Sequence, residues 1–396
     1  MNVPILRIPF SERDREFLRK GMDEILGSGM LTMGKYTRQF EELFAKFSGA
    51  RYCIAVSNGT AALEIILRAR GIEGGSVIVP TNTFLATAFA VIHSGNRVIF
   101  ADSDPKTLCL DVADVKRRLR PDTRAVILVH IGGIIPREIH ALQTLCEERG
   151  MDLIEDCAHA HGCALDGKQA GTFGIAGAFS FFPTKVLVTG EGGVITTSDE
   201  QVYRRATMIR NHGKNPDMGN RMSEVGHNQR LSELTALLGV QQMQEAAAAV
   251  EERQRLARLY DEALRGVEGV QPLTLPAGLT SSYYKYIAYL DEGYDRSQVK
   301  RLMKEKYGVS LTGEVYAELC HTEPVWDQYA YCGRRRQNGR VDCTRWPSCG
   351  CGEQQKDFPG AEYISRHHIC LPLYRGLGEA EVAYVVDSLR KTLTGC

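Results

Sequence analysis

Short apolar runs rich in valine, isoleucine and alanine recur between about residues 50 and 200 of the chain. They lack strict alternation of apolar and polar positions, which is typical of strands in a parallel sheet covered by helices on both faces. The predicted strands are 53–56, 76–79, 97–100, 125–129, 152–154 and 193–197. The intervening segments predict helices at 60–70, 84–93, 111–119 and 139–149. Strands and helices in regular alternation indicate an α/β fold with a mostly parallel sheet.

The chain after residue 230 follows a different pattern. Residues 231–265 are rich in Ala, Glu, Gln and Arg and predict one long helix that links two domains. A smaller α+β pattern follows, with strands at 283–290 and 309–311 and helices at 296–306 and 379–393. We therefore expect a large domain over residues 1–265, a small C-terminal α+β domain over 266–396, and a cleft between them. The polar segment at about 330–356 predicts a loop insertion in the small domain.

Composition narrows the classes of partner. The 396 residues carry 48 Lys and Arg against 48 Asp and Glu, so the net charge is zero and gives no electrostatic footprint for nucleic acid or an anionic membrane. No stretch approaches the ~20 apolar residues of a membrane span, and the start Met1–Arg7 lacks the apolar run of a signal peptide. We expect a cytoplasmic protein whose partners are a small molecule and a second copy of the chain.

Twelve cysteines are the one unusual feature of the composition. Most stand singly in apolar or helical contexts, and the expected reducing cytoplasm argues against a disulfide scaffold. Four crowd together in the predicted loop insertion: Cys332, Cys343, Cys349 and Cys351. Their spacing differs from the paired C-x2-C of common zinc modules, which favours loop thiols and leaves a structural metal as the alternative. We expect the purified protein to hold less than one equivalent of zinc or iron per chain.

A polar turn, Ser57–Thr60, separates the strand at 53–56 from the helix that follows it. In open parallel sheets, ligands bind at the carboxyl ends of the strands. The backbone N–H groups of Gly59, Thr60 and Ala61, together with the positive end of the helix dipole, would bind a phosphate there. A plain helix cap is the alternative, because Ser, Asn and Thr are common in that role.

An acidic residue, Asp156, follows the apolar strand at 152–154. A buried carboxylate is costly to keep charged unless it meets a cation, and a protonated pyridine nitrogen would be such a partner. A structural ion pair or a helix cap stays open. The nearby His159 and His161, together with His130, raise a further alternative, in which they and Asp156 hold the metal of a hydrolase.

Lys185 stands between the apolar segment Ala178–Phe182 and the glycine-rich turn Gly190–Gly193. The amine is therefore expected near the sheet in a partly desolvated place, where burial lowers its pKa and makes the neutral form accessible. Such a lysine can form a Schiff base with an aldehyde cofactor whose ring serves as an electron sink. A lone lysine usually lies at the surface, and a metal hydrolase would leave both Lys185 and the glycine-rich turn without a task.

Five motifs in order along the chain carry a resemblance to a known family. They are Asn58–Leu63 (NGTAAL), Pro80–Ala88 (PTNTFLATA), Glu155–Gly162 (EDCAHAHG), Ser180–Lys185 (SFFPTK) with Gly190–Gly193 (GEGG), and Gly226–Leu234 (GHNQRLSEL). Over nearly its whole length the chain resembles the DegT/DnrJ/EryC1/StrS family of pyridoxal-phosphate-dependent aminotransferases. The resemblance implies the aspartate aminotransferase fold (fold type I), whose large domain has a mostly parallel sheet of the seven-stranded type.

The resemblance also implies roles for single residues. Lys185 would form the Schiff base with pyridoxal 5′-phosphate and then move the proton during transamination, with pyridoxamine phosphate as the intermediate form. Asp156 would hold the pyridine nitrogen protonated, and His159 and Phe84 would pack around the cofactor ring. The implied phosphate contacts are Gly59, Thr60, Ser180 and, toward the neighbouring subunit's cofactor, Asn228.

A contact from Asn228 to the neighbouring cofactor implies a homodimer with shared active sites, near which the N-terminal segment 1–35 would pack. The implied reaction is ping-pong. Glutamate or glutamine gives an amino group that passes to a keto-sugar, which we expect to be nucleotide-linked, or to a keto-cyclitol, in antibiotic or glycan biosynthesis. The substrate-side candidates are Thr32, Tyr316 and His321, and no metal is expected in this site.

Other interpretations stay open. Relatives that are dehydratases with free pyridoxamine carry His in place of the lysine, so Lys185 argues against that activity. A relative that aromatises a cyclic keto acid by dehydration retains the lysine and is not excluded. A non-catalytic regulator would be expected to lose Lys185 or Asp156 first, and both are present. The apolar loop His130–Pro136 departs from the more polar segment of many sugar aminotransferases and leaves the acceptor open.

Overall fold

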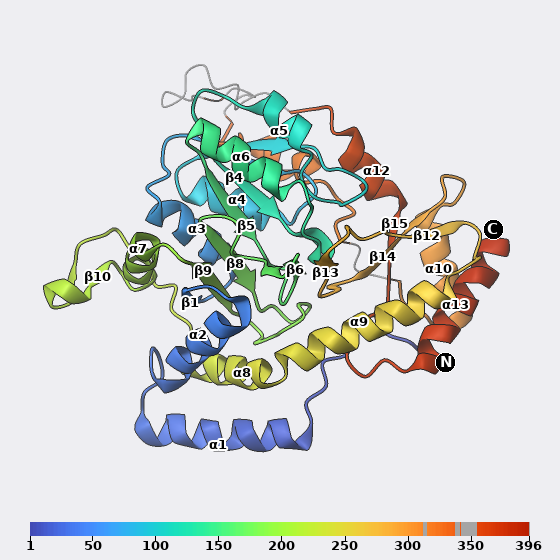
Figure 1. The fold of residues 1–396 in the computed structure, drawn as a ribbon, viewed down its shortest axis with the longest axis horizontal. Helices are drawn as coiled ribbons and strands as arrows, with labels where there is room; N and C mark the ends of the chain where they lie inside the picture. The colour runs from blue at the N-terminus through green and yellow to red at the C-terminus, as the bar shows by residue number, and fades with distance from the viewer. Residues whose placement is uncertain (312–314, 337–340, 342–354, 396) are drawn as a thin grey trace.

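A seven-stranded sheet forms the centre of the computed structural model, which describes residues 1–311, 315–336, 341 and 355–395 (Figure 1). Its strands are β1 (Tyr52–Val56), β2 (Ser76–Pro80), β3 (Arg97–Ala101), β4 (Thr123–Val129), β5 (Asp152–Asp156), β8 (Ala176–Ser180) and β9 (Gly193–Thr197). They lie in the order β1-β9-β8-β5-β4-β2-β3. Only β9 pairs antiparallel to its two neighbours within this sheet. The predicted mostly parallel α/β sheet is confirmed.

Both faces of this sheet are buried, which explains why its strands read as continuous apolar runs. Neighbouring residues along a strand enter different cores: Val77 and Val79 of β2 join one cluster of buried side chains, and Ile78 joins the other. Helices α3 (Gly59–Ala69), α4 (Ala86–His93) and α7 (Glu200–Arg210) contribute to the first cluster. Helices α2 (Lys35–Ser48), α5 (Val112–Arg118) and α6 (Ile139–Arg149) contribute to the second.

The linking helix predicted over 231–265 is wrong in one respect, because two helices occupy this region. They are α8 (Glu233–Gln244) and α9 (Ala246–Ala263). Glu245 between them leaves helical geometry, with φ −121° and ψ 9°. The composition of the segment favours helix throughout, so it gives no sign of the break. The predicted strand at 309–311 is also absent, since Val309 makes only an isolated parallel bridge with Val3.

A second, three-stranded antiparallel sheet lies in the C-terminal part of the chain, in the order β12 (Val270–Pro272), β14 (Tyr286–Leu290) and β15 (His368–Leu371). It shares a separate core cluster with α10 (Arg296–Tyr307), α13 (Glu379–Thr394) and the second half of α9. Val3 enters this same cluster. The domain division at residue 265 stays a prediction, because Leu256 and Tyr260 of α9 already pack in the C-terminal core.

Short elements complete the fold. They are β6 (Ala164–Leu165), β7 (Lys168–Gln169), β10 (Lys214–Asn215), β11 (Arg221–Met222), β13 (Leu279–Thr280), α11 (Val325–Gln328) and α12 (Pro359–His367). At the N-terminus, α1 (Glu12–Ser28) packs against α8. Helix α2 has no cap of its own at Gly34, and the buried carboxylate of Glu233 takes that place by accepting the backbone N–H groups of Gly34, Tyr36 and Thr37 at 2.8 to 3.0 Å.

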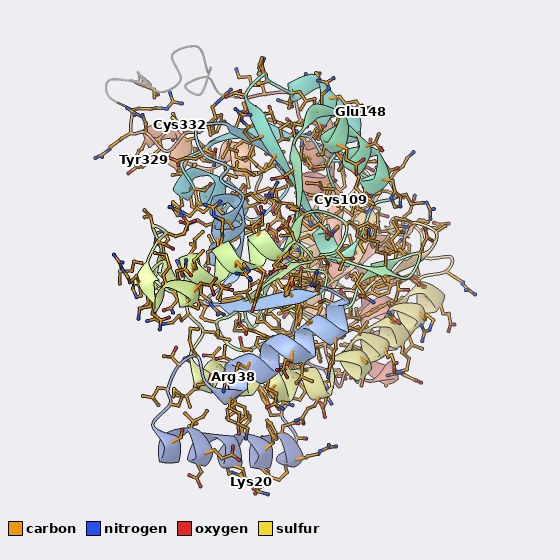
Figure 2. All side chains as sticks on the ribbon, turned by 60° about the vertical axis from the view of Figure 1, so that its left-hand side comes forward. Lys20, Arg38, Cys109, Glu148, Tyr329 and Cys332 are labelled. Atoms are coloured by element: carbon orange, nitrogen blue, oxygen red, sulfur yellow. The ribbon has the colours of Figure 1, made fainter. Side chains whose placement is uncertain are left out.

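The cysteines of the described ranges are free thiols, and all but Cys332 are buried. Figure 2 shows Cys109 in the interior and Cys332 at the periphery. Burial raises the pKa of the Cys109 thiol to about 12, so it stays protonated. Cys343, Cys349 and Cys351 of the predicted loop insertion lie outside the described residues. None of the helices that the structure describes is long and apolar enough to cross a membrane.

Candidate active site

A cavity of about 590 Å³ opens at the carboxyl ends of β5 and β8. It is lined by the start of α3, the turn before α4, the segment after β8 and residues from the C-terminal part of the chain. Eight of the predicted site residues share this lining: Gly59, Thr60, Phe84, Asp156, His159, Ser180, Lys185 and Tyr316. The parallel sheet brings them together because its strands end at a common edge.

Asp156 is the last residue of β5 and lies between β4 and β8 in the middle of the sheet. Its carboxylate accepts a hydrogen bond from the hydroxyl of Thr87 at 2.8 Å and one from the backbone N–H of Ala158 at 3.1 Å. Burial raises the pKa of the Asp156 carboxyl, and the two hydrogen bonds and the nearby Lys185 oppose this rise. The carboxylate therefore lies in a place that favours a cationic ligand group.

Lys185 follows β8 and lies partly buried in the cavity wall. Burial lowers the pKa of its ammonium group to about 8, with Asp156 acting in the opposite direction. The Lys185 Nζ lies 5.0 Å from the centroid of the Tyr284 ring. A lysine in this state supplies a substantial neutral fraction near physiological pH, which is what a nucleophilic amine requires.

Aromatic rings line the cavity beside Asp156. His159 stacks on Tyr284 with centroids 3.8 Å apart and ring planes at 8°. Its Nδ1 accepts the backbone N–H of Gly132 at 3.4 Å, so Nε2 is the protonated nitrogen that donates to the Tyr316 hydroxyl at 3.1 Å. Burial lowers the pKa of His159 well below its usual value, so the ring is neutral. Phe84 lies near Tyr316, with centroids 6.4 Å apart.

The predicted phosphate end is built at the first turn of α3. The Asn58 side chain accepts the N–H of Ala61 at 2.8 Å, so the cap alternative is correct for Asn58 and the prediction for Ala61 is wrong. Gly59 and Thr60 occupy the first helical positions, whose N–H groups have no acceptor within a helix. A Cβ on Gly59 would lie 3.0 Å from the Cβ of Ser180, so a larger residue there would require the helix terminus or β8 to shift slightly.

The glycine-rich turn before β9 also requires a residue without a side chain, because the backbone there passes close to another segment. A Cβ on Gly193 would lie 2.4 Å from the carbonyl carbon and oxygen of Asn58. The start of β9 therefore passes directly beside the turn that leads into α3. This contact fixes the helix terminus relative to the loop that carries Lys185, which runs from β8 to β9.

The metal site of the hydrolase alternative is not assembled among the described residues. The one cluster of potential ligands found there consists of His130, Glu155 and Cys157. The Glu155 carboxylate is already held by His130 at 2.8 Å and by three backbone N–H groups of the segment 171–174 at 2.7 to 2.8 Å. His161 is enclosed by phenylalanine rings, and burial lowers its pKa to about 3.

Three predicted residues lie outside the cavity lining. Thr32 is exposed, and its hydroxyl donates to the carbonyl of Leu231 at 3.4 Å. Asn228 is exposed and makes a bridge with Asn211. The His321 Nδ1 pairs with the Thr81 hydroxyl at 2.6 Å, and neither residue lines the cavity. Their roles toward a substrate or a neighbouring subunit stay predictions.

Other residues enter the site without having been predicted. Tyr284 lines the cavity and stacks on His159, although the sequence indicates only a residue near the start of the predicted strand 283–290. Thr87 supports Asp156, and its hydroxyl lies 3.1 Å from that of Thr83. Gln229 lines the cavity and accepts from the Ser57 hydroxyl at 2.5 Å. Thr87 and Gln229 fall within motifs quoted above, so the motifs were the available signal.

These residues fit a pyridoxal phosphate. The fit rests on a buried carboxylate without a formal ion pair, a lysine with a lowered pKa, and a helix terminus packed so closely that a Cβ would fill the space. Fold and cavity together fit a pyridoxal-phosphate-dependent enzyme with a large, mostly parallel α/β sheet.

Comparison with known proteins agrees. The chain belongs to the DegT/DnrJ/EryC1/StrS aminotransferase family, whose pattern matches residues 12–338. It is 33% identical to dTDP-4-dehydro-2,3,6-trideoxy-D-glucose 4-aminotransferase of Saccharopolyspora spinosa, over 93% of this chain and 92% of that one. It is 31% identical to the spore coat polysaccharide biosynthesis protein SpsC of Bacillus subtilis, over 94% and 93%. The solved structure of DesI in the presence of its TDP-sugar product is similar, with TM-score 0.84, 29% identity and coverage of 99% and 93%.

Proposed function

We propose that this aminotransferase uses pyridoxal phosphate to move an amino group from glutamate or glutamine to a nucleotide-linked keto-sugar. The observation that carries the proposal is the pairing of Lys185 and Asp156 in one cavity, close enough for each charge to shift the pKa of the other group. When bound, the cofactor supplies an electron sink that stabilises negative charge at the carbon next to nitrogen. A keto-cyclitol is the second acceptor class to test.

The chain's own residues have separable tasks in this proposal. Neutral Lys185 would hold the cofactor through its amine and, when free, would serve as the base that moves a proton. Asp156 keeps the pyridine nitrogen protonated, with Thr87 and Ala158 holding the carboxylate in place. Neutral His159 presents a flat face that Tyr284 supports from behind. Gly59, Thr60 and Ser180 receive the phosphate.

The acceptor class is supported by the relatives. One relative is a dTDP-4-dehydro-2,3,6-trideoxy-D-glucose 4-aminotransferase, and a similar solved structure was determined in the presence of a TDP-sugar product. The His130–Pro136 loop, which departs from the family pattern, presents Gly132 to His159 and not a polar side chain. Selection among sugars would then depend on other walls of the cavity.

We further propose that the active form is a homodimer with shared sites. Phe84 and Phe182 line the cavity and yet are 65% and 45% exposed in the single chain. A second copy of the chain would bury these two side chains in the dimer interface. The hairpin β10–β11 extends away from the body next to α7 (Figure 1). It carries Met222 and is followed by Val225, which are 69% and 81% exposed. Asn228, the residue proposed to reach the neighbouring subunit's cofactor, follows this hairpin in the sequence.

A half-reaction tests the chemistry. Protein loaded with pyridoxal phosphate is treated with glutamate or glutamine, and the return of the original absorbance is followed with nucleotide keto-sugars and with keto-inositols. The keto-sugars should restore the spectrum, and Lys185→Ala should abolish both directions. Recovery with inositols alone would overturn the nucleotide-sugar assignment. Loss of water from a keto acid without a donor would favour the dehydratase, and wild-type protein that binds no cofactor would favour the regulator.

Complementation tests the shared site. Lys185→Ala and Asn228→Asp are each expected to be inactive alone. Coexpressed, they should give about a quarter of wild-type activity, because half of the dimers would hold one intact site. A monomer by light scattering, or no recovery on coexpression, would contradict the proposal.

A further inference from the structure

Two lysines share one aromatic ring at the wall of the active site. The Lys185 Nζ lies 5.0 Å from the centroid of Tyr284, and the Lys285 Nζ lies 5.2 Å from the same point. Because both distances end at one centroid, the two amines lie within about 10 Å of each other. That is close enough for their charges to interact through partly buried protein.

The ring that sets this distance is fixed. Tyr284 is buried, stacks on His159 at 3.8 Å, and its hydroxyl donates to the Thr184 hydroxyl at 3.3 Å. Thr184 is the residue before Lys185. The Tyr284 side chain therefore contacts both the His159 ring and the chain segment that carries Lys185. The ring that both amines approach therefore has a fixed position in the packed structure.

Lys285, like Lys185, is partly exposed, and it borders a cavity that Lys185 does not line. It lines a second cavity of about 410 Å³, whose wall also includes Asp261, Ser281 and Tyr286. A partly hydrated lysine retains its proton at neutral pH. The Tyr284 ring thus lies beside the Lys285 amine, which borders the second cavity, and beside the Lys185 amine in the active site.

We propose that Lys285 is a positioning residue of the active site, whose positive charge disfavours a second positive charge on Lys185 and so favours the neutral amine that attacks an aldehyde. The inference rests on the proposed role of Lys185. It assigns to Lys285 no contact with substrate or cofactor. A lysine next to another cation is one of the general ways to activate an amine.

The electrostatics of Lys185 agree in direction. Burial is the largest cause of its lowered pKa, Lys285 lowers it further, and Asp156 raises it. The neighbouring His159 is also pushed toward the neutral form by both lysines. The other titratable groups that line the cavity with Lys185 are Glu64, His93, Asp156, His159, Glu191, Tyr284 and Tyr316.

The test measures the proton affinity of Lys185 in the full chain freed of cofactor. Protein is pulse-labelled with an amine-specific reagent over pH 6 to pH 11, and labelling of the peptide that contains Lys185 is quantified by mass spectrometry. Lys285→Met should move the midpoint upward by about 0.3 to 1 pH unit, from Coulomb's law at about 10 Å with an effective dielectric constant between 80 and 20. Lys285→Arg should keep the wild-type midpoint.

Two further variants calibrate the measurement. Lys168→Met removes a lysine that also lies over an aromatic ring, 4.7 Å from Phe173, but away from the cavity, and should change nothing. Asp156→Asn removes the opposing charge and should move the midpoint downward. Lys285→Gln replaces Lys285→Met if the latter loses the wild-type circular dichroism spectrum.

An unchanged midpoint in folded Lys285→Met or Lys285→Gln, with the expected shift in Asp156→Asn, would overturn the inference. So would an equal upward shift in Lys285→Arg, since that would indicate packing and not charge. The labelling needs neither cofactor nor substrate. A wrong assignment of the reaction would therefore appear in the half-reaction and leave this midpoint measurable.

Discussion

Three glycine-to-alanine substitutions test how closely the strands approach the start of α3. Gly27 lies exposed on α1, and a Cβ there would meet nothing within 4 Å. A Cβ on Gly59 would lie 3.0 Å from the Ser180 Cβ. A Cβ on Gly193 would lie 2.4 Å from backbone atoms of Asn58, which cannot move without displacing the helix terminus. The added methyl group would thus meet open space at Gly27, a side-chain carbon at Gly59 and a backbone carbonyl at Gly193.

The expected effects follow this order. Gly27→Ala should stabilise the protein by up to about 1 kcal/mol, because alanine is the better helix former. Gly59→Ala should destabilise it by about 1 to 2 kcal/mol through overpacking, and Gly193→Ala by about 3 kcal/mol. Displacing the first turn of α3 should also weaken pyridoxal phosphate binding by Gly59→Ala about tenfold, equivalent to about 1.4 kcal/mol.

The assay is urea unfolding followed by circular dichroism, read as the transition midpoint, together with cofactor affinity from fluorescence quenching. Gly27→Ala is the matched control for both measurements. Equal midpoints for Gly193→Ala and Gly27→Ala would refute the close approach of β9 to Asn58. Wild-type cofactor affinity in Gly59→Ala would refute the assignment of this helix terminus to the phosphate.

Three other outcomes are expected. Burial raises the pKa of Asp156 above its ordinary 3.8, so the folded state binds this proton more tightly than the unfolded state, and the stability of the cofactor-free protein should fall as pH rises above about 4. Asp156→Asn should flatten this part of the dependence of the melting temperature on pH. An unchanged slope would contradict the burial argument. Glu233→Gln should lower stability by about 2 kcal/mol in urea unfolding, because charged hydrogen bonds to the start of α2 are weakened, whereas exposed Glu16→Gln should not. Metal analysis should find less than one equivalent of zinc or iron per chain, and one full equivalent would establish a metal site.

The sequence predicts the sheet well because burial on both faces leaves an unbroken apolar signal in each strand. It predicts Asp156 and Lys185 because each charged residue interrupts such a signal at the end of a strand. It does not predict Tyr284, whose role depends on a stacking contact with His159, more than a hundred positions earlier in the chain. The cap of α2 by Glu233 cannot be predicted from the local sequence either, since donor and acceptor lie 196 to 199 positions apart. The break at Glu245 is a backbone feature within a segment of uniformly high helix propensity.

Helix α9 determines which large motions the protein can make. Its first residue packs in a core of the seven-stranded sheet, Val250 packs against Val186 and Tyr284, and Leu256 and Tyr260 enter the C-terminal core. Buried Arg253, in the middle of the helix, donates to the carbonyl of Tyr283 at 3.0 Å. Helix α9 is continuous and packs at three places along its length. A rotation of the C-terminal sheet relative to the seven-stranded sheet would therefore have to bend this helix or change its angle at Glu245. Because Val250 of this helix packs with both Val186 and Tyr284, a movement of α9 would be transmitted to Tyr284 and to the residue next to Lys185.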